Sequence, residues 1–314
     1  MAHGLMFHHF CDEVHPKGQG AITAAEFSAL IDHVGRDRIL DAEEWLRRHE
    51  RDRLGPEDLC LTFDDGLRCQ YDIALPVLRR HGLTAFWFVY SSVFEGNVEP
   101  LEIYRYFRTV AFSCVEDFYR SFFAQAQAQH PTLCAAGLDG FDPDRYLSAY
   151  PFYTRMDRQF RYLRDRVLGA ERYDGVMMTL IREAGFDTEA LRERLWMTDD
   201  QLRILDGEGH RIGLHSYSHP TVLADWPIER QEEEYRRNYE HLSGVLSRPP
   251  QVMSHPCNSY HAETLTLLRR LGMRCGFCSS MHPVASRTPL EWPRMDHALL
   301  MRSLLQDRKD SMGG

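Results

Sequence analysis

The chain has 314 residues, of which 43% are hydrophobic and 26% charged, and its formal net charge is −9 at pH 7. This length and ordinary globular composition suit one large domain with an insertion, or two domains, and the acidic balance argues against nonspecific binding to nucleic acid. We expect a cytoplasmic protein without a transmembrane segment, because no apolar stretch is long enough to span a bilayer and the N-terminus lacks a cationic leader.

The first ninety residues alternate between strand-like and helix-like patterns. An apolar run at 5–10 predicts a first strand that ends near His8 and His9. A capping box beginning at Thr23 opens a predicted helix, and an amphipathic helix is expected at 41–53. A helix that Pro76 breaks but does not end is expected at 68–81, followed by a strand at 83–89. Strand, helix and strand in succession are typical of a parallel sheet.

Two adjacent carboxylates follow a predicted buried strand. The apolar run 59–63 delivers Asp64 and Asp65 directly before Gly66. Neighbouring residues of an extended chain point to opposite sides, but at a strand end the chain can turn and let both carboxyls reach one pocket. One carboxylate of such a pair can bind a cation while the other moves a proton. The alternative interpretation is a strand followed by a plain Asp-Gly turn.

A long segment then separates Phe94 from Trp196, about 100 residues, which far exceeds a usual strand-to-helix connection. Its pattern is mostly helical and rich in arginines and aromatics, with one aromatic cluster at 107–123 and another at 146–162. Three interpretations remain open: a helical subdomain with its own aromatic core, a cap that offers aromatic platforms and arginines to an anionic sugar, or a dimer surface. We therefore divide the chain into 1–94, an insertion at 95–197, and 198–314.

The remaining elements repeat the alternation. A capped helix is expected from Thr198 and a strand at 211–214, and residues 228–246 predict a long helix. On that helix Glu229 to Glu234 are expected to form a solvated face. Strands are predicted at 251–254 and 273–278, with a helix at 262–271 between them. The cysteines are scattered, and Cys275 and Cys278 are predicted to be buried free thiols.

Two histidines follow the 211–214 strand. His215 and His219 lie on one face if the chain coils there, and neutral imidazoles so placed are good ligands for a divalent ion. Asp65 as a third ligand would leave coordination positions open, as in a catalytic site. We expect Zn, with Co, Ni, Mn or Fe as alternatives. The competing interpretation is a polar loop with two solvated histidines.

These motifs together resemble a known family. Thr62–Gly66 followed by His215-Ser-x-x-His219 looks like the first two signatures of the polysaccharide deacetylases, the NodB-homology carbohydrate esterases. The resemblance implies an α/β fold, a distorted (β/α) barrel with its site at the C-terminal strand ends, here with an inserted, mostly helical cap subdomain. It also implies that Asp64 is the general base and that Asp65 and the two histidines bind the metal. For His8 it implies a place in the pocket lining, and the alternative is a surface histidine.

The later signatures of the family are altered. Residues 255–260 occupy the place of its third motif, and the resemblance implies that the backbone N–H of Cys257 stabilises the oxyanion. His255 would be a pocket wall, a polar contact or a general acid. Arg294 resembles an arginine that orients the catalytic aspartate, and His297 could be the late histidine that acts as general acid.

The resemblance implies a hydrolase of carbon–nitrogen bonds. We expect a metal-dependent deacetylase that removes an N-acetyl or O-acetyl group from a sugar, a saccharide precursor of surface glycan biosynthesis, with a homodimer possible. Two alternatives stay open. One is a metal-dependent hydrolase of a non-sugar amide such as a ureide or imide, and the other is a sugar-binding homologue that has lost catalysis.

Overall fold

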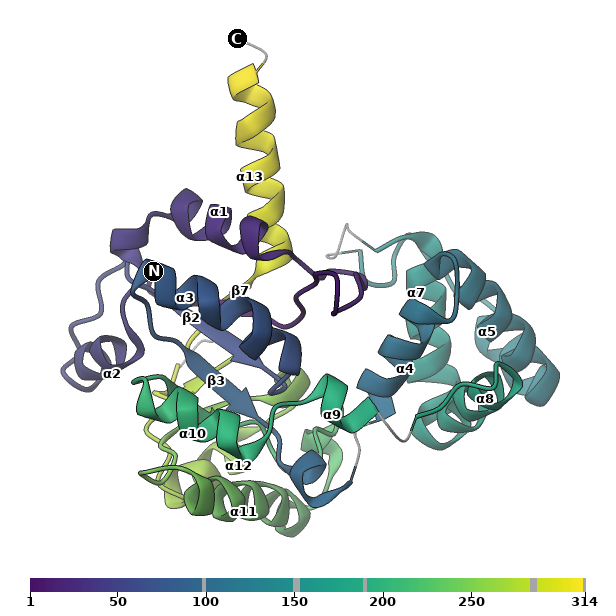
Figure 1. The fold of residues 1–314 in the computed structure, drawn as a ribbon. Coiled ribbons are helices and arrows are strands. Elements are labelled where there is room, and N and C mark those ends of the chain that lie inside the picture. Colours follow the sequence, from purple (N-terminus) through teal and green to yellow (C-terminus); the bar gives the residue numbers. More distant parts are fainter. Residues whose placement is uncertain (98–99, 149–152, 189–190, 283–286, 313–314) are drawn as a thin grey trace. The chain divides into compact units, whose positions relative to one another are not determined.

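The computed structural model describes residues 1–97, 100–148, 153–188, 191–282 and 287–312 (Figure 1). The chain divides into two compact units, and each is described by itself. The first comprises Met1–Glu99 and Arg192–Gly314, and the second Pro100–Leu191. The division of the chain at residues 94 and 197 remains a prediction.

The first unit is built on one parallel sheet whose spatial order is β6-β5-β4-β3-β2-β1-β7. Hydrogen bonds from the segment before β7 reach both β6 and β1, because Trp292 N–H donates to Gly276 O and Gly4 N–H to Pro293 O. The sheet is therefore a nearly closed barrel, and the expected (β/α) barrel is confirmed. The strands are β1 (His3–Phe7), β2 (Leu59–Asp64), β3 (Phe86–Val89), β4 (Arg211–Leu214), β5 (Val252–Ser254), β6 (Cys275–Phe277) and β7 (Arg294–Asp296).

Aromatic side chains pack on both faces of the strands. On β3, Phe86 and Phe88 join the buried cluster around Trp45, whereas Trp87 points the other way and stacks on Phe63 at 4.4 Å between ring centroids. This alternation is the period-two pattern of an extended chain. It explains why the strands read as continuous apolar runs, since both of their faces are buried.

Helices surround the barrel, and two of them begin at capping boxes that the sequence predicts. Thr23 and Thr198 both form the expected capping boxes. The α-helices of this unit are α1 (Ala24–Val34), α2 (Ala42–Glu50), α3 (Leu75–His81), α9 (Arg192–Leu195), α10 (Asp199–Gly207), α11 (Ile228–Val245), α12 (Ala262–Arg270) and α13 (His297–Met312). Short 3-10 turns lie at Arg36–Arg38, Ser92–Glu95, Leu223–Asp225 and Pro256–Asn258, and a π-turn lies at Gln70–Ala74. In Figure 1, α13 starts beside α1 and extends away from the strands.

Two elements differ in detail from the expectation. The first strand ends at Phe7 and not at residue 10, so His8 and His9 lie on the loop that leaves the sheet. The helix expected at 68–81 continues through Pro76, but residues 70–74 form a π-turn directly before α3. Proline lacks the N–H that this position would otherwise donate, and helices are commonly irregular beside it.

The second unit is helical, as expected. It contains α4 (Pro100–Val110), α5 (Val115–Gln129), α6 (Pro131–Leu138), α7 (Arg155–Tyr162) and α8 (Gly169–Glu183), with a π-turn at Leu163–Leu168. Phe107, Phe118, Phe122 and Phe160 are buried together, so the unit has an aromatic core of its own. The cap and dimer interpretations remain predictions, and Tyr150 and Phe152 of the second aromatic cluster lie outside the described residues.

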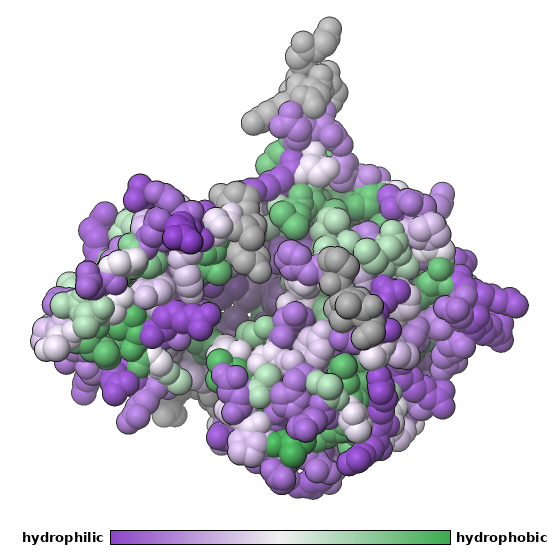
Figure 2. Space-filling model, turned by 180° about the vertical axis from the view of Figure 1, so that it is seen from behind, coloured by the Kyte–Doolittle hydropathy of each residue, from purple (hydrophilic) through white to green (hydrophobic). Residues whose placement is uncertain are grey.

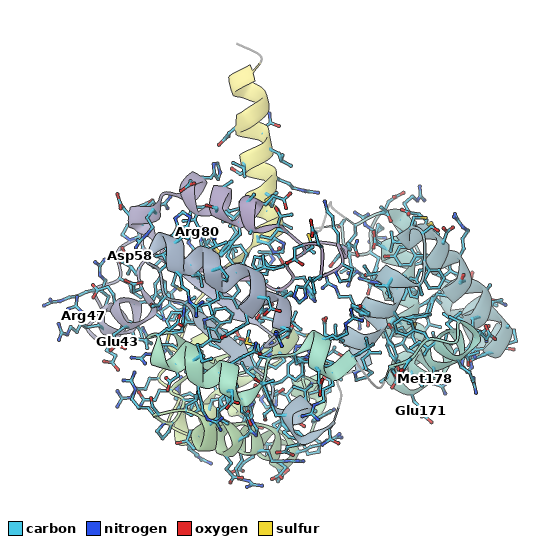
Figure 3. The ribbon with its side chains drawn as sticks, in the orientation of Figure 1. Glu43, Arg47, Asp58, Arg80, Glu171 and Met178 are labelled. Atoms are coloured by element: carbon cyan, nitrogen blue, oxygen red, sulfur yellow. The ribbon has the colours of Figure 1, made fainter. Side chains whose placement is uncertain are left out.

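Charged side chains cover the outward faces of the helices. Figure 3 shows Glu43 and Arg47 on α2, and Glu171 on α8, directed outward. The face drawn in Figure 2 is mostly hydrophilic, with apolar residues interspersed. Among the described helices, none is both long enough and apolar enough to cross a membrane. Cys275 and Cys278 are buried free thiols, as expected.

Candidate active site

The residues expected to act together gather at the carboxyl ends of neighbouring strands. Phe7 pairs with Phe63 across β1 and β2, so the residues that follow them, His8 and Asp64, lie side by side. Leu214 pairs with Met253 across β4 and β5, and this register brings His215 beside Ser254 in the same way. In a parallel barrel the carboxyl ends of the strands meet at one rim, where active sites of this architecture lie.

A turn at the end of β2 brings both carboxylates into the same pocket. Asp65 has a left-handed backbone with φ of 78°, and Gly66 follows with φ of 62°. Only glycine fits at the second position without strain, because a Cβ atom there would also lie 3.2 Å from Val89 Cγ1. The Asp-Gly turn is therefore real, and it is the device that directs Asp65 toward the histidines.

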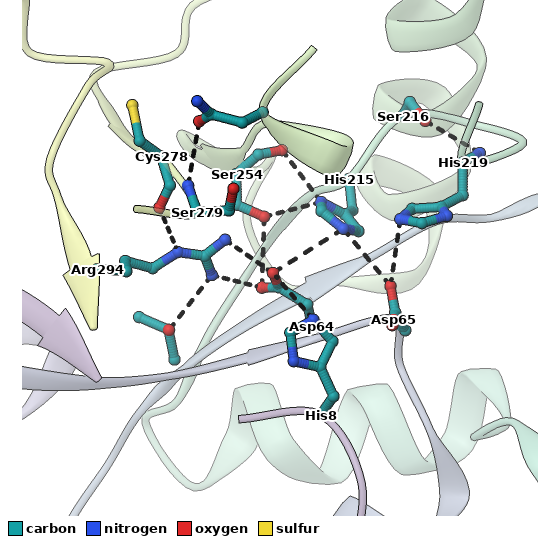
Figure 4. A network of polar contacts seen from close by, with 12 residues as sticks. His8, Asp64, Asp65, His215, Ser216, His219, Ser254, Cys278, Ser279 and Arg294 are labelled. Atoms are coloured by element: carbon teal, nitrogen blue, oxygen red, sulfur yellow. Dashed lines mark hydrogen bonds and ion pairs between the residues drawn. The ribbon is translucent and has the colours of Figure 1, made fainter. Parts of the chain in front are cut away.

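Asp65, His215 and His219 form a cluster whose donor atoms all lie within 4.8 Å of one another (Figure 4). Asp65 Oδ1 lies 3.5 Å from Nε2 of each histidine and is buried, and none of the residues that the structure describes donates a hydrogen bond to it. Two ligands of a tetrahedral zinc ion, each about 2.0–2.1 Å from it, stand roughly 3.3 Å apart. The donor set, its spacing and the unpartnered carboxylate oxygen thus fit a divalent cation.

The neighbouring strand β5 fixes the ring of His215. Its Nδ1 lies 3.1 Å from the carbonyl oxygen of Ser254, which can only accept, and 2.8 Å from the Ser254 hydroxyl. In the neutral imidazole the proton is therefore on Nδ1, and the lone pair of Nε2 faces Asp65. Ser254 Oγ also lies 3.4 Å from Asp64 Oδ1, so one hydroxyl touches both the first aspartate and a histidine of the cluster.

Arg294 forms a buried ion pair with Asp64. Its NH1 and NH2 donate to the two carboxylate oxygens at 2.6 and 2.7 Å, and its Nε donates to Cys278 O at 2.7 Å. The arginine is only 1% exposed. Gly4 on the adjacent strand makes room for it, because a Cβ atom there would lie 3.0 Å from Arg294 Cγ. Asp64 is thus held in one orientation by a two-pronged ion pair.

Burial and charge act in opposite directions on the acidic groups. Burial would raise the pKa of Asp64, but the positive charges of Arg294 and His215 outweigh it and lower that pKa below its usual value. The pKa of Asp65 is also lowered, against burial, by His219 and His215. Burial lowers the pKa of His215, but the two carboxylates raise it on balance. Both aspartates are therefore anionic at neutral pH, and protons compete with a cation for the His215 imidazole.

His8 stands at the open side of Asp64. Its Nε2 lies 3.8 Å from Asp64 Oδ2, and its side chain is 28% exposed. The buried amide of Gln70 donates to both His8 O at 2.8 Å and Asp64 O at 2.6 Å, and so ties the two strand ends together. His8 is therefore placed beside the carboxylate and retains access to solvent.

The two other histidines expected near the site have different surroundings. His255 is fully buried, its Nε2 donates to Leu290 O at 2.9 Å, and its ring stacks on Tyr260. Burial lowers its pKa to about 4, so it is neutral at physiological pH, and these contacts favour the pocket-wall interpretation over the acid role. His297 is buried against Phe7, its Nε2 contacts Gly20 O at 2.8 Å, and burial lowers its pKa.

The loop after β5 has an unusual backbone. Cys257 and Asn258 are both left-handed, with φ of 49° and 57°. Asparagine tolerates this conformation better than most residues, whereas cysteine does not. The conformation turns the chain sharply after Pro256, at the rim where the proposed oxyanion donor, the Cys257 N–H, is located. Its role remains a prediction.

Sequence reasoning missed the residues that support the site from outside. The expectation that Glu234 lies on a solvated face is wrong: it is 9% exposed and accepts hydrogen bonds from the loop between the two histidines. Asn238, one turn later on α11, accepts from His215 N–H. The available signal was periodicity, since both residues fall on the stripe that α11 buries, which comprises Gln231, Glu234, Tyr235, Asn238 and Leu242.

Comparison with known proteins tests whether the motifs around the two aspartates and two histidines reflect a real similarity to the polysaccharide deacetylases. The family model for polysaccharide deacetylases matches residues 180–276. Residues 180–276 are thus similar to a polysaccharide deacetylase domain. The expected resemblance is confirmed, and with it the enzyme class, hydrolases of carbon–nitrogen bonds. The matched segment of the deacetylase domain contains both histidines of the cluster and the loop after β5, whereas Asp64 and Asp65 precede it.

Solved structures of low sequence identity share the fold. The deacetylase PplD of Streptococcus pyogenes, solved in complex with acetate, has a TM-score of 0.55 and 15% identity over 97% of this chain and 96% of its own. A de-N-acetylase from Aggregatibacter actinomycetemcomitans has a TM-score of 0.54 and 12% identity over 94% of each chain. No sequence among the curated proteins matches this chain. At these identities the structural likeness establishes the fold and not the substrate.

Proposed function

We propose that this protein is a metal-dependent deacetylase that hydrolyses an acetyl group, N-linked or O-linked, on a sugar. The observation that carries the proposal is a carboxylate held by a buried arginine beside a cluster of cation ligands with an unpartnered oxygen. A structural metal site would not need a second, separately oriented carboxylate next to it. The family match supports an acetylated saccharide as the substrate.

Asp65, His215 and His219 would hold the cation. A divalent ion there would act as a Lewis acid toward the acetyl carbonyl and the attacking water. The protein supplies the remaining roles. Asp64 accepts the proton of the water as its oxygen bonds to the carbonyl carbon, and Arg294 keeps that carboxylate ionised and oriented. The Cys257 N–H donates to the oxygen that becomes negative.

Breaking the C–N bond requires a proton for the departing amine. His8 suits this role better than His297 or His255, because its ring is partly exposed and lies next to Asp64, from which it can be reprotonated. The other two rings use Nε2 on backbone carbonyl oxygens and are buried. The products are acetate and the free amine, and the proton taken by Asp64 balances the proton given by His8.

The first test is acetate release from a panel of free, nucleotide-linked and polymeric acetyl sugars, with ureides and imides included. We expect turnover of an acetyl sugar, and a loss of about 10²–10⁴-fold in kcat for Asp64→Asn with cation binding retained. Asp200→Asn, an exposed carboxylate, is the matched control. Normal hydrolysis by Asp64→Asn would refute the role of the base. Turnover of only non-sugar amides would favour the alternative hydrolase.

A second test addresses the acid. His8→Gln should slow amide hydrolysis but spare an acetyl ester with a good leaving group such as 4-nitrophenolate, which departs without a proton. His297→Gln should affect both substrates alike. Equal losses on both substrates for His8→Gln would remove His8 from the role.

A further inference from the structure

The loop between the two histidines has a backbone that would not persist without support. Ser216 and His219 are both left-handed, with φ of 61° and 54°, and neither is a glycine. Residues with branched or bulky side chains adopt this conformation only where the surrounding structure enforces it. Within the loop, His219 N–H donates to Ser216 Oγ at 3.1 Å. Further hydrogen bonds hold the loop from outside.

The outside support comes from α11. Glu234 Oε2 accepts from Tyr217 N–H at 3.1 Å and from Ser218 N–H at 2.8 Å, and Oε1 accepts from the Ser218 hydroxyl at 2.8 Å. One carboxylate thus collects three donors from two consecutive residues. Hydrogen bonds to a charged acceptor are shorter and about twice as strong as neutral ones, so this is a firm anchor for the middle of the loop.

The start of the loop is anchored one helical turn later. Asn238 Oδ1 accepts from His215 N–H at 3.1 Å, and its amide donates to Val89 O at 3.0 Å. Residues four apart on a helix lie on the same face, so Glu234 and Asn238 present one surface to the loop. Both are buried although they are polar, which is unusual unless their partners are satisfied.

We propose that Glu234 is a positioning residue for the cation site. By holding residues 217 and 218, its carboxylate fixes the left-handed turns on either side and so sets the separation of the two imidazoles. The hydrogen bonds of Glu234 go to Tyr217 and Ser218, so the carboxylate acts through the loop. This inference rests on the cation role proposed for Asp65, His215 and His219.

The test is cation affinity, measured by competition of Zn²⁺ between the full-length protein and a coloured chelator. Glu234→Gln keeps the shape of the side chain but removes its charge and turns an NH₂ group toward backbone donors. We expect its cation binding to weaken about 10–100-fold, as for other residues that orient metal ligands. Glu232→Gln, an exposed glutamate of the same helix, should bind as the wild type does.

Two further readouts separate positioning from general stability. The visible spectrum of the Co²⁺-loaded protein should change in Glu234→Gln, because it reports the geometry of the ligands. The circular dichroism of the cation-free variant should match that of Glu232→Gln. If Glu234→Gln does not fold, Ser218→Ala, which removes one of the three donors, should give a smaller loss of affinity in a folded protein.

The outcomes are distinct. Wild-type cation affinity and an unchanged Co²⁺ spectrum in a folded Glu234→Gln would overturn the role of Glu234 and leave the proposed function intact. If Glu234→Gln does not fold, the same result for Ser218→Ala would have the same meaning. A wild-type protein that binds no cation would overturn both.

Discussion

Arg294 and Asp64 form an ion pair whose contribution to stability can be measured apart from catalysis. Both side chains are nearly inaccessible to solvent, and each carboxylate oxygen receives one guanidinium N–H. Removing one partner of such a pair strands the other charge in a medium that solvates it poorly, at a cost of about 3–5 kcal/mol. We expect Arg294→Met to lower the free energy of unfolding by that amount.

The pairwise part follows from a double-mutant cycle. Asp64→Asn alone leaves a buried guanidinium with a weaker acceptor, whereas the double variant leaves no unpaired charge. The losses of unfolding free energy in the two single variants should therefore add up to about 2–3 kcal/mol more than the loss in the double variant. Met is a long side chain like Arg, and Asn has the shape of Asp, so neither substitution should open a large cavity.

Urea unfolding followed by tryptophan fluorescence is the suitable assay. All five tryptophans, Trp45, Trp87, Trp196, Trp226 and Trp292, lie in the barrel unit, so the signal reports that unit and not the helical one. Additivity of the two substitutions within about 0.5 kcal/mol would show that the charges do not interact, and would refute the reasoning. In catalysis, Arg294→Met should raise the pKa of Asp64 and move the acid limb of the rate profile to higher pH, because the guanidinium normally lowers that pKa.

Three further outcomes are expected. A chelator should abolish acetate release and added Zn²⁺ should restore it, while His215→Ala should stay inactive at any cation concentration; undiminished activity after dialysis against a chelator would contradict this. Burial lowers the pKa of His255 to about 4, below its unfolded value, so its neutral form stabilises the fold fully above pH 6.5 and this contribution declines by roughly 1.4 kcal/mol per unit as pH falls toward 4. In His255→Gln, the unfolding free energy measured by chemical denaturation should fall less steeply as pH decreases from 6.5 to 4. The same pH dependence as in the wild type would rule out this contribution of His255. Gly66→Ala should destabilise the barrel by about 1–2 kcal/mol because φ is 62°, and a gain in melting temperature would be inconsistent with the strain assigned there.

The order of strands and helices was predictable from the sequence, because each strand of a parallel barrel is buried on both faces and reads as an apolar run. The strand at 211–214 has the expected limits, and the capping boxes begin helices where they should. The pair Asp64–Asp65 and the two histidines could be singled out, since their residue types and spacing are local features. That they converge depends on the strand register, which the sequence does not display.

Contacts between distant segments account for what sequence reasoning missed. The burial of His297 depends on the carbonyl of Gly20, and that of His255 on Leu290, and neither partner is marked by a motif. Glu234 looked like part of a charged surface because glutamates dominate residues 229–234. Only the position of the helix against the loop reveals that one of them faces inward. The insertion was recognisable as helical from its composition, but whether it covers a substrate is still a prediction.

Five residues of the rim, Asp65, Ser216, His219, Cys257 and Asn258, have left-handed backbones although none is a glycine. Each such residue costs of order 1–3 kcal/mol. Glycine at several of these positions would relieve the strain and could raise the melting temperature, but it would also alter the side chains and turns that form the proposed cation site. Improvements are therefore better sought on the outer helices, where a gain in robustness has no chemical consequence.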